Sequence, residues 1–296
     1  MNGLLVIDKP SDWTSHDVVG RTRRILNTRK VGHAGTLDPM ATGVLVLGVG
    51  RATRLLGYIA GADKTYLATI RLGQSTVTDD AEGDVTAVAT PDVLAALTFA
   101  SVLQGIELLT GEIEQVPSSV SAIKVDGQRA YAKVRSGNEV KLQARRVTVS
   151  SFNALSYEHG DAYFDIAVEV TCSSGTYIRA LARDLGAELG VGGHLTSLRR
   201  TRVGQWPLTD AIELETFGQL STPSQALIPI AEAAARVFPK WVVDDGEAAF
   251  VRNGRRIDWT FSGLEDGPIA IFDQSGEFLA LAERHGPTAK YPAVFV

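Results

Sequence analysis

The sequence predicts an α+β fold built on a mixed, largely antiparallel sheet. Short apolar or β-branched runs recur along the 296 residues, and helix-like patterns separate few of them. A doubly wound parallel sheet would need helices and strands to alternate. The chain is also long enough for a large domain followed by a small one.

Local composition predicts the elements of the first half of the chain. Apolar or β-branched runs predict strands over 3–8, 43–50 and 64–73. Helices are expected after a cap at Thr14 or Ser15, in a short segment over 52–61, and over 91–103. Turn-forming residues fill 74–84.

The second half adds strands, the strongest helical pattern and a domain boundary. Strands are expected at 119–125, 146–153 and 162–171, and a helix over 175–190. Pro and Ser near 220–238 indicate a boundary, so we expect domains of 1–225 and 236–296. The smaller domain should be strand-rich, because 270–283 has the pattern of two strands joined by a turn at Ser275 and Gly276.

The charge of the chain is unevenly distributed. The net charge is −5, yet residues 1–55, 124–146 and 179–202 carry +4, +5 and +3. These basic islands are either chance clusters on solvated faces or parts of a phosphate-binding track that the fold brings together. Charge alone leaves both interpretations open.

Composition also argues against several classes of protein. No apolar run approaches the roughly 20 residues that a membrane span needs. Because Cys172 is the single cysteine, an internal disulfide or a four-cysteine zinc site is excluded. The five histidines show no metal-binding spacing. We expect a cytoplasmic protein with no metal site.

One carboxylate, Asp38, stands in a segment rich in turn-forming residues. Gly35 and Gly43 permit unusual backbone angles, and Pro39 restrains Asp38 to an extended conformation. Asp-Pro often begins a turn, so a purely structural role is one alternative. A rigidly aimed reactive group between a basic helix and a buried strand is the other. His33 could bond this carboxylate or contact a ligand.

Two further stretches contain candidate site residues. Tyr177 and Arg179 begin the predicted helix over 175–190, where Arg179 would be costly among apolar neighbours unless a carboxylate paired with it. Tyr66 follows Lys64 on a predicted strand, where an aromatic ring can stack on a base or simply be half-buried. The basic segment 116–146 is either a mobile flap or a hairpin with a charged rim.

Long motifs in this chain resemble those of bacterial tRNA pseudouridine-55 synthases, the TruB family, in its actinobacterial form. The resemblance covers residues 3–205, and the tail from about 238 is similar to the small PUA-like RNA-binding domain of that family. The motifs follow one another as GLLVIDKPSDWTSHDVV, KVGHAGTLDPMATGVLVLGVGRATR, DKTYLATIRLGQSTVTDDAEG, QVPSSVSAIKVDGQRAY, CSSGTYIRALARDLG and GGHLTSLRRTRVG.

The resemblance implies an isomerase that needs no cofactor. Such an enzyme breaks the N1–C1′ bond of a uridine in the TΨC loop of tRNA, turns the uracil and rejoins it through C5. Asp38 matches the catalytic aspartate, and Arg179 matches the residue that pairs with it. Tyr66 would stack on the uracil and take part in catalysis. The target nucleotide must be flipped out of its loop, and the positions that contact it correspond to His33, Tyr66, Tyr177 and Leu198.

The resemblance also implies how RNA would be held. Phosphates of the T-arm stem-loop would be neutralised by Lys9, Arg199 and Arg200, together with Arg21, Arg23, Arg24 and Arg202. The flap would close over the RNA, and the protein would act as a monomer without an obligate protein partner. Two alternatives remain: a tRNA-binding folding chaperone whose chemistry is secondary, and a guide-RNA-directed pseudouridylase.

Overall fold

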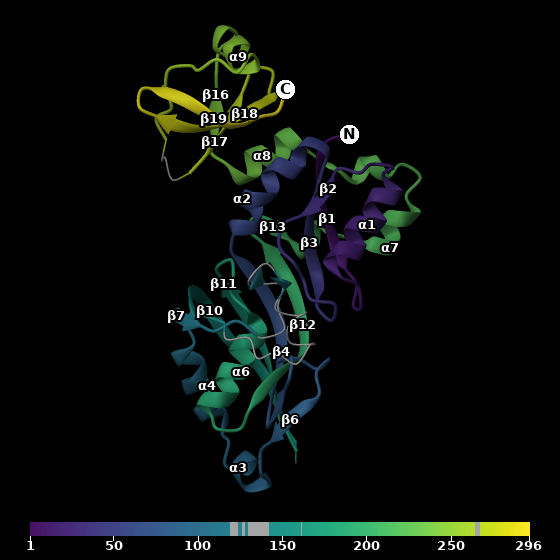
Figure 1. Cartoon of the computed structure of the whole chain (residues 1–296), viewed down its shortest axis with the longest axis vertical. Coiled ribbons are helices and arrows are strands. Elements are labelled where there is room, and N and C mark those ends of the chain that lie inside the picture. Colours follow the sequence, from purple (N-terminus) through teal and green to yellow (C-terminus); the bar gives the residue numbers. More distant parts are fainter. Residues whose placement is uncertain (119–123, 126–127, 130–141, 161, 264–266) are drawn as a thin grey trace.

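A computed structural model describes residues 1–118, 124–125, 128–129, 142–160, 162–263 and 267–296 (Figure 1). Most of the predicted flap, and most of the predicted strand over 119–125, therefore lie outside the described residues. Helices in the described part are α1 (Ser15–Ile25), α2 (Leu56–Gly61), α3 (Pro91–Ala95), α4 (Phe99–Leu108), α6 (Ile178–Glu188), α7 (Leu214–Gln219), α8 (Ile230–Val237) and α9 (Asp245–Arg252), with short 3₁₀ turns η1 (Gly50–Leu55), η2 (Leu208–Asp210) and η3 (Pro223–Ala226).

A large mixed sheet forms the centre of the molecule. Its path runs β14-β1-β3-β12-β4-β11-β10-β7, with β2, β13 and β15 paired at its sides. Only the β1–β14 and β3–β12 pairs are parallel, so the predicted mixed, largely antiparallel sheet is confirmed. Its strands are β1 (Gly3–Lys9), β2 (Val31–His33), β3 (Thr42–Val49), β4 (Lys64–Leu72), β7 (Gly111–Gln115), β10 (Arg145–His159), β11 (Phe164–Cys172), β12 (Gly193–Val203), β13 (Trp206–Pro207), β14 (Ile212–Glu213) and β15 (Ile228–Pro229).

Smaller sheets complete the fold. The C-terminal sheet has the order β16-β17-β18-β19 and lies at the end of the molecule opposite α3 (Figure 1). The predicted strand–turn–strand over 270–283 is confirmed there. The strands of the smaller sheets are β5 (Gln74–Thr76) with β6 (Val85–Val88), β8 (Lys124–Val125) with β9 (Gln128–Arg129), and β16 (Lys240–Val242), β17 (Ile269–Phe272), β18 (Phe278–His285) and β19 (Thr288–Val294).

The structure departs from the sequence predictions most clearly at a helix and at a strand. The pattern over 91–103 forms two helices, because Thr98 begins α4 with a capping box and so separates it from α3. The central strand β12 was not predicted from local composition. Its pairing with β4 shifts register twice, between Leu195 and Ser197 and between Arg200 and Arg202. These irregularities destroy the alternation of apolar and polar residues that marks a strand.

Helices cover both faces of the large sheet. Helices α1 and α7 pack against β1 and β3 through a cluster that contains Val18, Leu45 and Phe217. Helix α6 packs against β4 and β12 through Leu181 and Leu185. None of the helices among the described residues has the length and apolar character needed to cross a bilayer.

The C-terminal sheet shares a hydrophobic cluster with the large sheet. Val6 and Val46 of the large sheet and Phe272 and Phe278 of the C-terminal sheet belong to it. The side chain of Arg51 also donates a 2.5 Å hydrogen bond to the carbonyl of Phe295. Strand β15 pairs with β1 at 228–229, so the large sheet extends slightly beyond residue 225. The division into domains of 1–225 and 236–296 stays a prediction.

We expect Phe278→Ala to destabilise the whole chain. Phe278 is 3% exposed within the shared cluster, and truncating a buried phenylalanine costs about 3–5 kcal/mol. Denaturant unfolding followed by circular dichroism and tryptophan fluorescence should show one transition at a lower midpoint. Phe250→Ala is the control, because Phe250 is 44% exposed and should change stability by less than about 1 kcal/mol. Two separated transitions, with the larger one unchanged, would contradict a shared core.

Candidate active site

The segment between β2 and β3 holds Asp38 in a loop that is tied down along its length. The hydroxyl of Ser15 accepts from the Leu37 amide at 2.8 Å and lies 3.1 Å from the Leu37 carbonyl. The Pro39 carbonyl accepts from the amide of Asp12 at 2.9 Å and from the ammonium of Lys9 at 3.0 Å. Bonds on both sides of Asp38 therefore restrict where its carboxylate can point. We name residues 34–41 the Asp38 loop.

Glycine is required at one position within this loop and at one just after it. Gly35 and Gly43 have φ values of +91° and +98°, which L-residues with a side chain rarely adopt. A Cβ at Gly43 would lie 2.2 Å from the Arg200 carbonyl oxygen. The glycine signal in the sequence thus reflects a strained turn and a close approach of two strands.

Arg179 joins Asp38 to a second carboxylate. Its Nε lies 3.0 Å from the Oδ2 of Asp38, and its Nη1 lies 3.3 Å from the Oδ2 of Asp80. The same Nη1 donates to the Thr78 carbonyl at 2.8 Å. The Arg179 side chain is 5% exposed and that of Asp80 is 3% exposed, whereas that of Asp38 is 36% exposed. Asp38 is therefore the member of this network that a ligand can reach.

The sequence indicated that a buried Arg179 would need a carboxylate, and this is confirmed. Asp80 itself was missed, although it stands in the turn-rich stretch 74–84. Asp80 accepts from the hydroxyl of Thr78 at 2.5 Å and from the amide of Glu82 at 3.1 Å. Two features of the sequence could have pointed to Asp80. It is one of two adjacent acids in a predicted turn, and Arg179 is an arginine predicted to lie among apolar residues, where it needs a carboxylate.

An apolar surface adjoins the ionic network. Leu37 and Ala41 of the Asp38 loop belong to the same buried cluster as Tyr66, Ile178 and Leu198. Burial raises the pKa of the Tyr66 phenol, so this side chain stays neutral at physiological pH. The fold thus brings Tyr66 and Leu198, from neighbouring strands β4 and β12, to the loop that carries Asp38.

Tyr177 and His33 lie at element ends close to these groups. Tyr177 is the N-cap of α6, two residues before Arg179. The carboxamide of Gln115 holds its backbone, accepting from the Tyr177 amide at 2.9 Å and donating to the Tyr177 carbonyl at 3.1 Å. His33 ends β2, and burial lowers the pKa of its imidazole, which favours the neutral ring.

Lys9 and Arg200 do not have the exposure expected of phosphate-contacting residues. Lys9 is 0% exposed and Arg200 is 1% exposed. Lys9 donates to the carbonyls of Pro10, Trp13 and Pro39, and burial lowers the pKa of its ammonium to about 8. Neither side chain is exposed to a ligand in this structure, and the expectation that they bind phosphate stays a prediction. Both hold backbone around the site.

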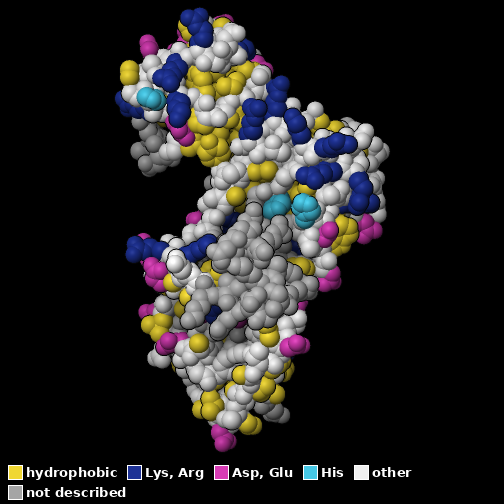
Figure 2. All heavy atoms as spheres, viewed as in Figure 1, with side chains coloured by type: hydrophobic (Ala, Val, Ile, Leu, Met, Phe, Trp, Pro, Cys, Tyr) yellow, Lys and Arg dark blue, Asp and Glu magenta, His cyan; other side chains and the backbone are white. Residues whose placement is uncertain are grey.

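The remaining basic residues are more accessible. Arg199 is 37% exposed and pairs with Asp8, and Arg21 and Arg24 are exposed on α1. Arg23 donates to the Val31 carbonyl at 2.8 Å. Figure 2 shows Lys and Arg side chains gathered on the upper part of one face, over the C-terminal sheet and the elements beneath it. Within the described residues, exposure therefore differs widely among the basic residues expected to contact phosphate.

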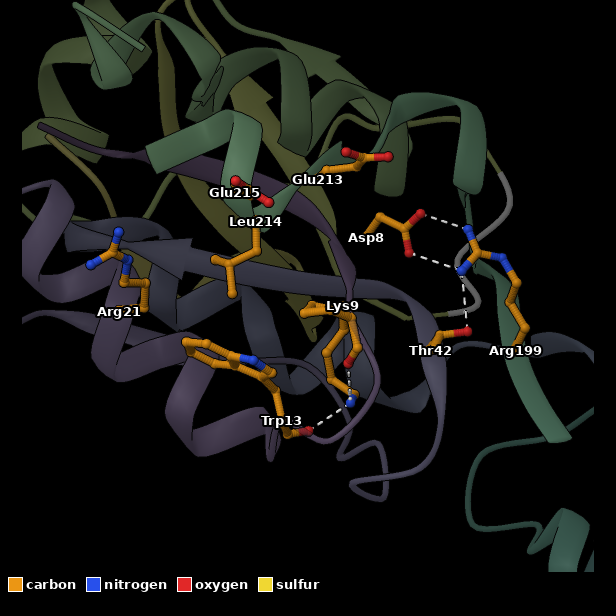
Figure 3. A pocket seen from close by; sticks show the side chains of 10 residues that line it. Asp8, Lys9, Trp13, Arg21, Thr42, Arg199, Glu213, Leu214 and Glu215 are labelled. Carbon is orange, nitrogen blue, oxygen red and sulfur yellow. Dashed lines mark hydrogen bonds and ion pairs between the residues drawn. The ribbon is translucent and has the colours of Figure 1, made fainter. Parts of the chain in front are cut away.

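A pocket of about 620 Å³ lies beside the Asp38 loop (Figure 3). Its described lining contains neither Asp38 nor Arg179. Arg199 reaches into it and bonds Asp8 and Thr42. The described lining of this pocket therefore differs from the residues of the ionic network. The full lining is Asp8, Lys9, Pro10, Trp13, Arg21, Thr42, Arg199, Glu213, Leu214 and Glu215.

Three family models match most of this chain. Residues 23–178 match the family described as TruB family pseudouridylate synthase (N terminal domain). Residues 179–227 match the tRNA pseudouridylate synthase B C-terminal domain, and residues 238–296 match tRNA Pseudouridine synthase II, C terminal.

Curated proteins and solved structures are also similar to this chain over nearly its full length. A tRNA pseudouridine synthase B of Leifsonia xyli is 55% identical over 98% of this chain and 95% of its own. One from Streptomyces griseus is 54% identical over 99% and 97%. Among solved structures, a Cbf5-Nop10-Gar1 complex contains a chain with a TM-score of 0.75 and 27% identity, covering 99% of this chain and 85% of that one. An H/ACA RNP bound to a substrate RNA gives a TM-score of 0.73 at 26% identity, with the same coverage.

Proposed function

Because this chain belongs to the TruB family of pseudouridylate synthases, we propose that it converts uridine 55 in the TΨC loop of tRNA to pseudouridine and that Asp38 is its catalytic carboxylate. The chain is a tRNA pseudouridine synthase, and its reaction is an isomerisation. The single observation that carries the assignment of Asp38 is its pairing with buried Arg179 while its own side chain stays 36% exposed.

The chemistry needs one accessible carboxylate at the ribose. Glycosidases that release their leaving group use two carboxylates, one of which protonates it. An isomerase keeps the uracil, so a single acid suffices for the sugar. The carboxylate of Asp38 acts on the ribose, and the guanidinium of Arg179 pairs with it at 3.0 Å. Tyr66 stacks on the uracil, which is worth about 1–3 kcal/mol in comparable sites.

The neighbouring residues shape the pocket for the flipped nucleotide. Leu198 and the apolar part of the Asp38 loop exclude water from the reacting sugar. Tyr177 and His33 contact the nucleotide, and a neutral His33 fits into the space that the base leaves in its loop. Exposed arginines, Arg199 among them, neutralise phosphates of the T-arm. The protein acts in the cytoplasm as a monomer.

The test is a product assay with purified protein and two transcripts. A T-arm stem-loop with uridine at position 55 should yield pseudouridine, detected by carbodiimide labelling and primer extension. The same stem-loop with cytidine at position 55 and uridines elsewhere should yield none. Product at other uridines but not at position 55 would refute the assignment of the modified site.

A guide-RNA-directed enzyme is the second candidate, favoured by the likeness to the Cbf5 and H/ACA structures. Identities above 50% to proteins named tRNA pseudouridine synthase B favour the stand-alone enzyme. The bare stem-loop separates them, because a guide-directed enzyme would need added guide RNA and partner proteins to form product. A chaperone whose chemistry is secondary would refold tRNA without forming pseudouridine at a useful rate.

We expect Arg199→Gln to weaken tRNA binding and flatten its dependence on salt. Removing one phosphate contact should reduce the slope of log K against log[salt] by about 1. The measurement is tRNA affinity at several salt concentrations. Arg71→Gln is the control, because Arg71 pairs with Asp165 on the same sheet away from the Asp38 loop and should leave the slope unchanged. An unchanged slope for Arg199→Gln would show that Arg199 does not contact a phosphate of the tRNA.

A further inference from the structure

We propose that Arg200 is a positioning residue, which holds the Asp38 loop in place for catalysis without touching RNA. This inference rests on the proposed function of Asp38. It assigns a role to a side chain that is 1% exposed and bonds backbone carbonyls at the site.

The Arg200 guanidinium bonds to the first part of the Asp38 loop and to the strand that follows the loop. Its Nη2 donates to the Gly35 carbonyl at 3.1 Å and its Nη1 lies 3.4 Å from the Thr36 carbonyl. Its Nε donates to the Val44 carbonyl at 2.8 Å, on the strand that follows the loop. A planar guanidinium with five N–H donors can bond several carbonyls at fixed angles, which an ammonium group cannot do in the same way.

The position of Arg200 in the sheet brings it to both parts of the site. On β12 it stands opposite Gly43 of β3 and opposite Tyr66 of β4. The backbones of Gly43 and Arg200 approach each other closely, which leaves the main chain of Arg200 little freedom to move. Arg200 and Tyr66 are therefore direct neighbours across the two strands.

The charge of Arg200 has no carboxylate partner among the residues that the structure describes. In place of a carboxylate, the backbone carbonyls of Gly35, Thr36 and Val44 surround the guanidinium. Burying a cation in this way is costly, and packing alone would not require a charge here. This arrangement is explained if the three bonds fix the backbone around the loop and so keep the carboxylate of Asp38 aimed.

The test compares Arg200→Lys with Arg71→Lys. Arg71 is a matched control because it also makes a bidentate contact within the large sheet, with Asp165, outside the site. The single-turnover rate of pseudouridine formation at saturating tRNA should fall about 100-fold or more for Arg200→Lys, since a misplacement of about 1 Å can cost that much. Its tRNA affinity should stay within about threefold of wild type, with the salt slope unchanged. Arg71→Lys should change neither quantity.

Hydrogen exchange gives a readout that does not depend on activity. In Arg200→Lys the amides of Ala34, Leu37 and Ala41 should exchange faster, while amides of β17 and β18 stay as protected as in wild type. If Arg200→Lys does not fold, Arg200→Gln replaces it under the same criteria. A wild-type rate, a loss confined to affinity with a flatter salt slope, or a uniform rise in exchange would overturn the proposal. An inactive wild type would instead refute the proposed function.

Discussion

Asp38→Asn should abolish pseudouridine formation while tRNA binding is largely retained. The substitution keeps the shape of the side chain and removes the charge that acts on the ribose. Removing the reactive group of an enzyme site costs about 10³-fold or more in rate, which corresponds to about 4 kcal/mol of the barrier. Single-turnover assays on the T-arm stem-loop measure the rate, and filter binding measures the affinity.

The control for this experiment is Asp165→Asn. Asp165 is also an aspartate paired with an arginine, Arg71, but it lies on β11 away from the Asp38 loop. Its rate should stay within about threefold of wild type. If Asp38→Asn forms product at the wild-type rate, another group carries the chemistry. If it loses affinity and rate in equal proportion, Asp38 binds RNA and does not act on the ribose.

Arg179→Lys should lower the rate by about 100-fold or more with a small change in affinity. A lysine keeps a positive charge, but its ammonium cannot occupy the positions from which Arg179 meets Asp38, Asp80 and the Thr78 carbonyl together. The carboxylate of Asp38 then loses its orientation, and poor orientation affects the chemical step more than binding.

Arg183→Lys is the matched control on the same helix, one turn further along. Its side chain is 30% exposed and pairs with Asp79 and Asp184. The rate of pseudouridine formation by Arg183→Lys should stay within about tenfold of the wild-type rate. Thermal unfolding of both variants shows whether a loss of rate follows a loss of fold. Equal losses of affinity in both variants, with no separate effect on rate, would contradict the positioning of Asp38 by Arg179.

The Asp38 loop shows how far local sequence can predict a site. Glycine and proline around Asp38 correctly indicated a constrained segment, because backbone restrictions act between neighbours in the chain. The need of Arg179 for a carboxylate also followed from its apolar neighbours. Its second partner, Asp80, stands 99 positions away in sequence, and no local pattern connects the two residues.

The basic residues show where sequence reasoning fails. Arg199 and Arg200 are adjacent and chemically identical, yet one is 37% exposed beside a pocket and the other is fully enclosed. Successive residues of a strand point to opposite faces, so their environments depend on which elements cover each face. Lys9 is likewise buried, and it bonds backbone carbonyls. A count of charges along the chain therefore cannot tell which of them face solvent.

The sequence by itself determined the fold class, the order of motifs and the identity of the constrained acid, because these depend on local propensity and on family resemblance. Only the tertiary structure decided which charges face solvent and which hold backbone. It also decided that Asp38, Arg179 and Asp80 form one network and that β12 is a central strand. These outcomes depend on contacts between distant segments, whose free energies are set by burial and geometry that no single stretch of sequence contains.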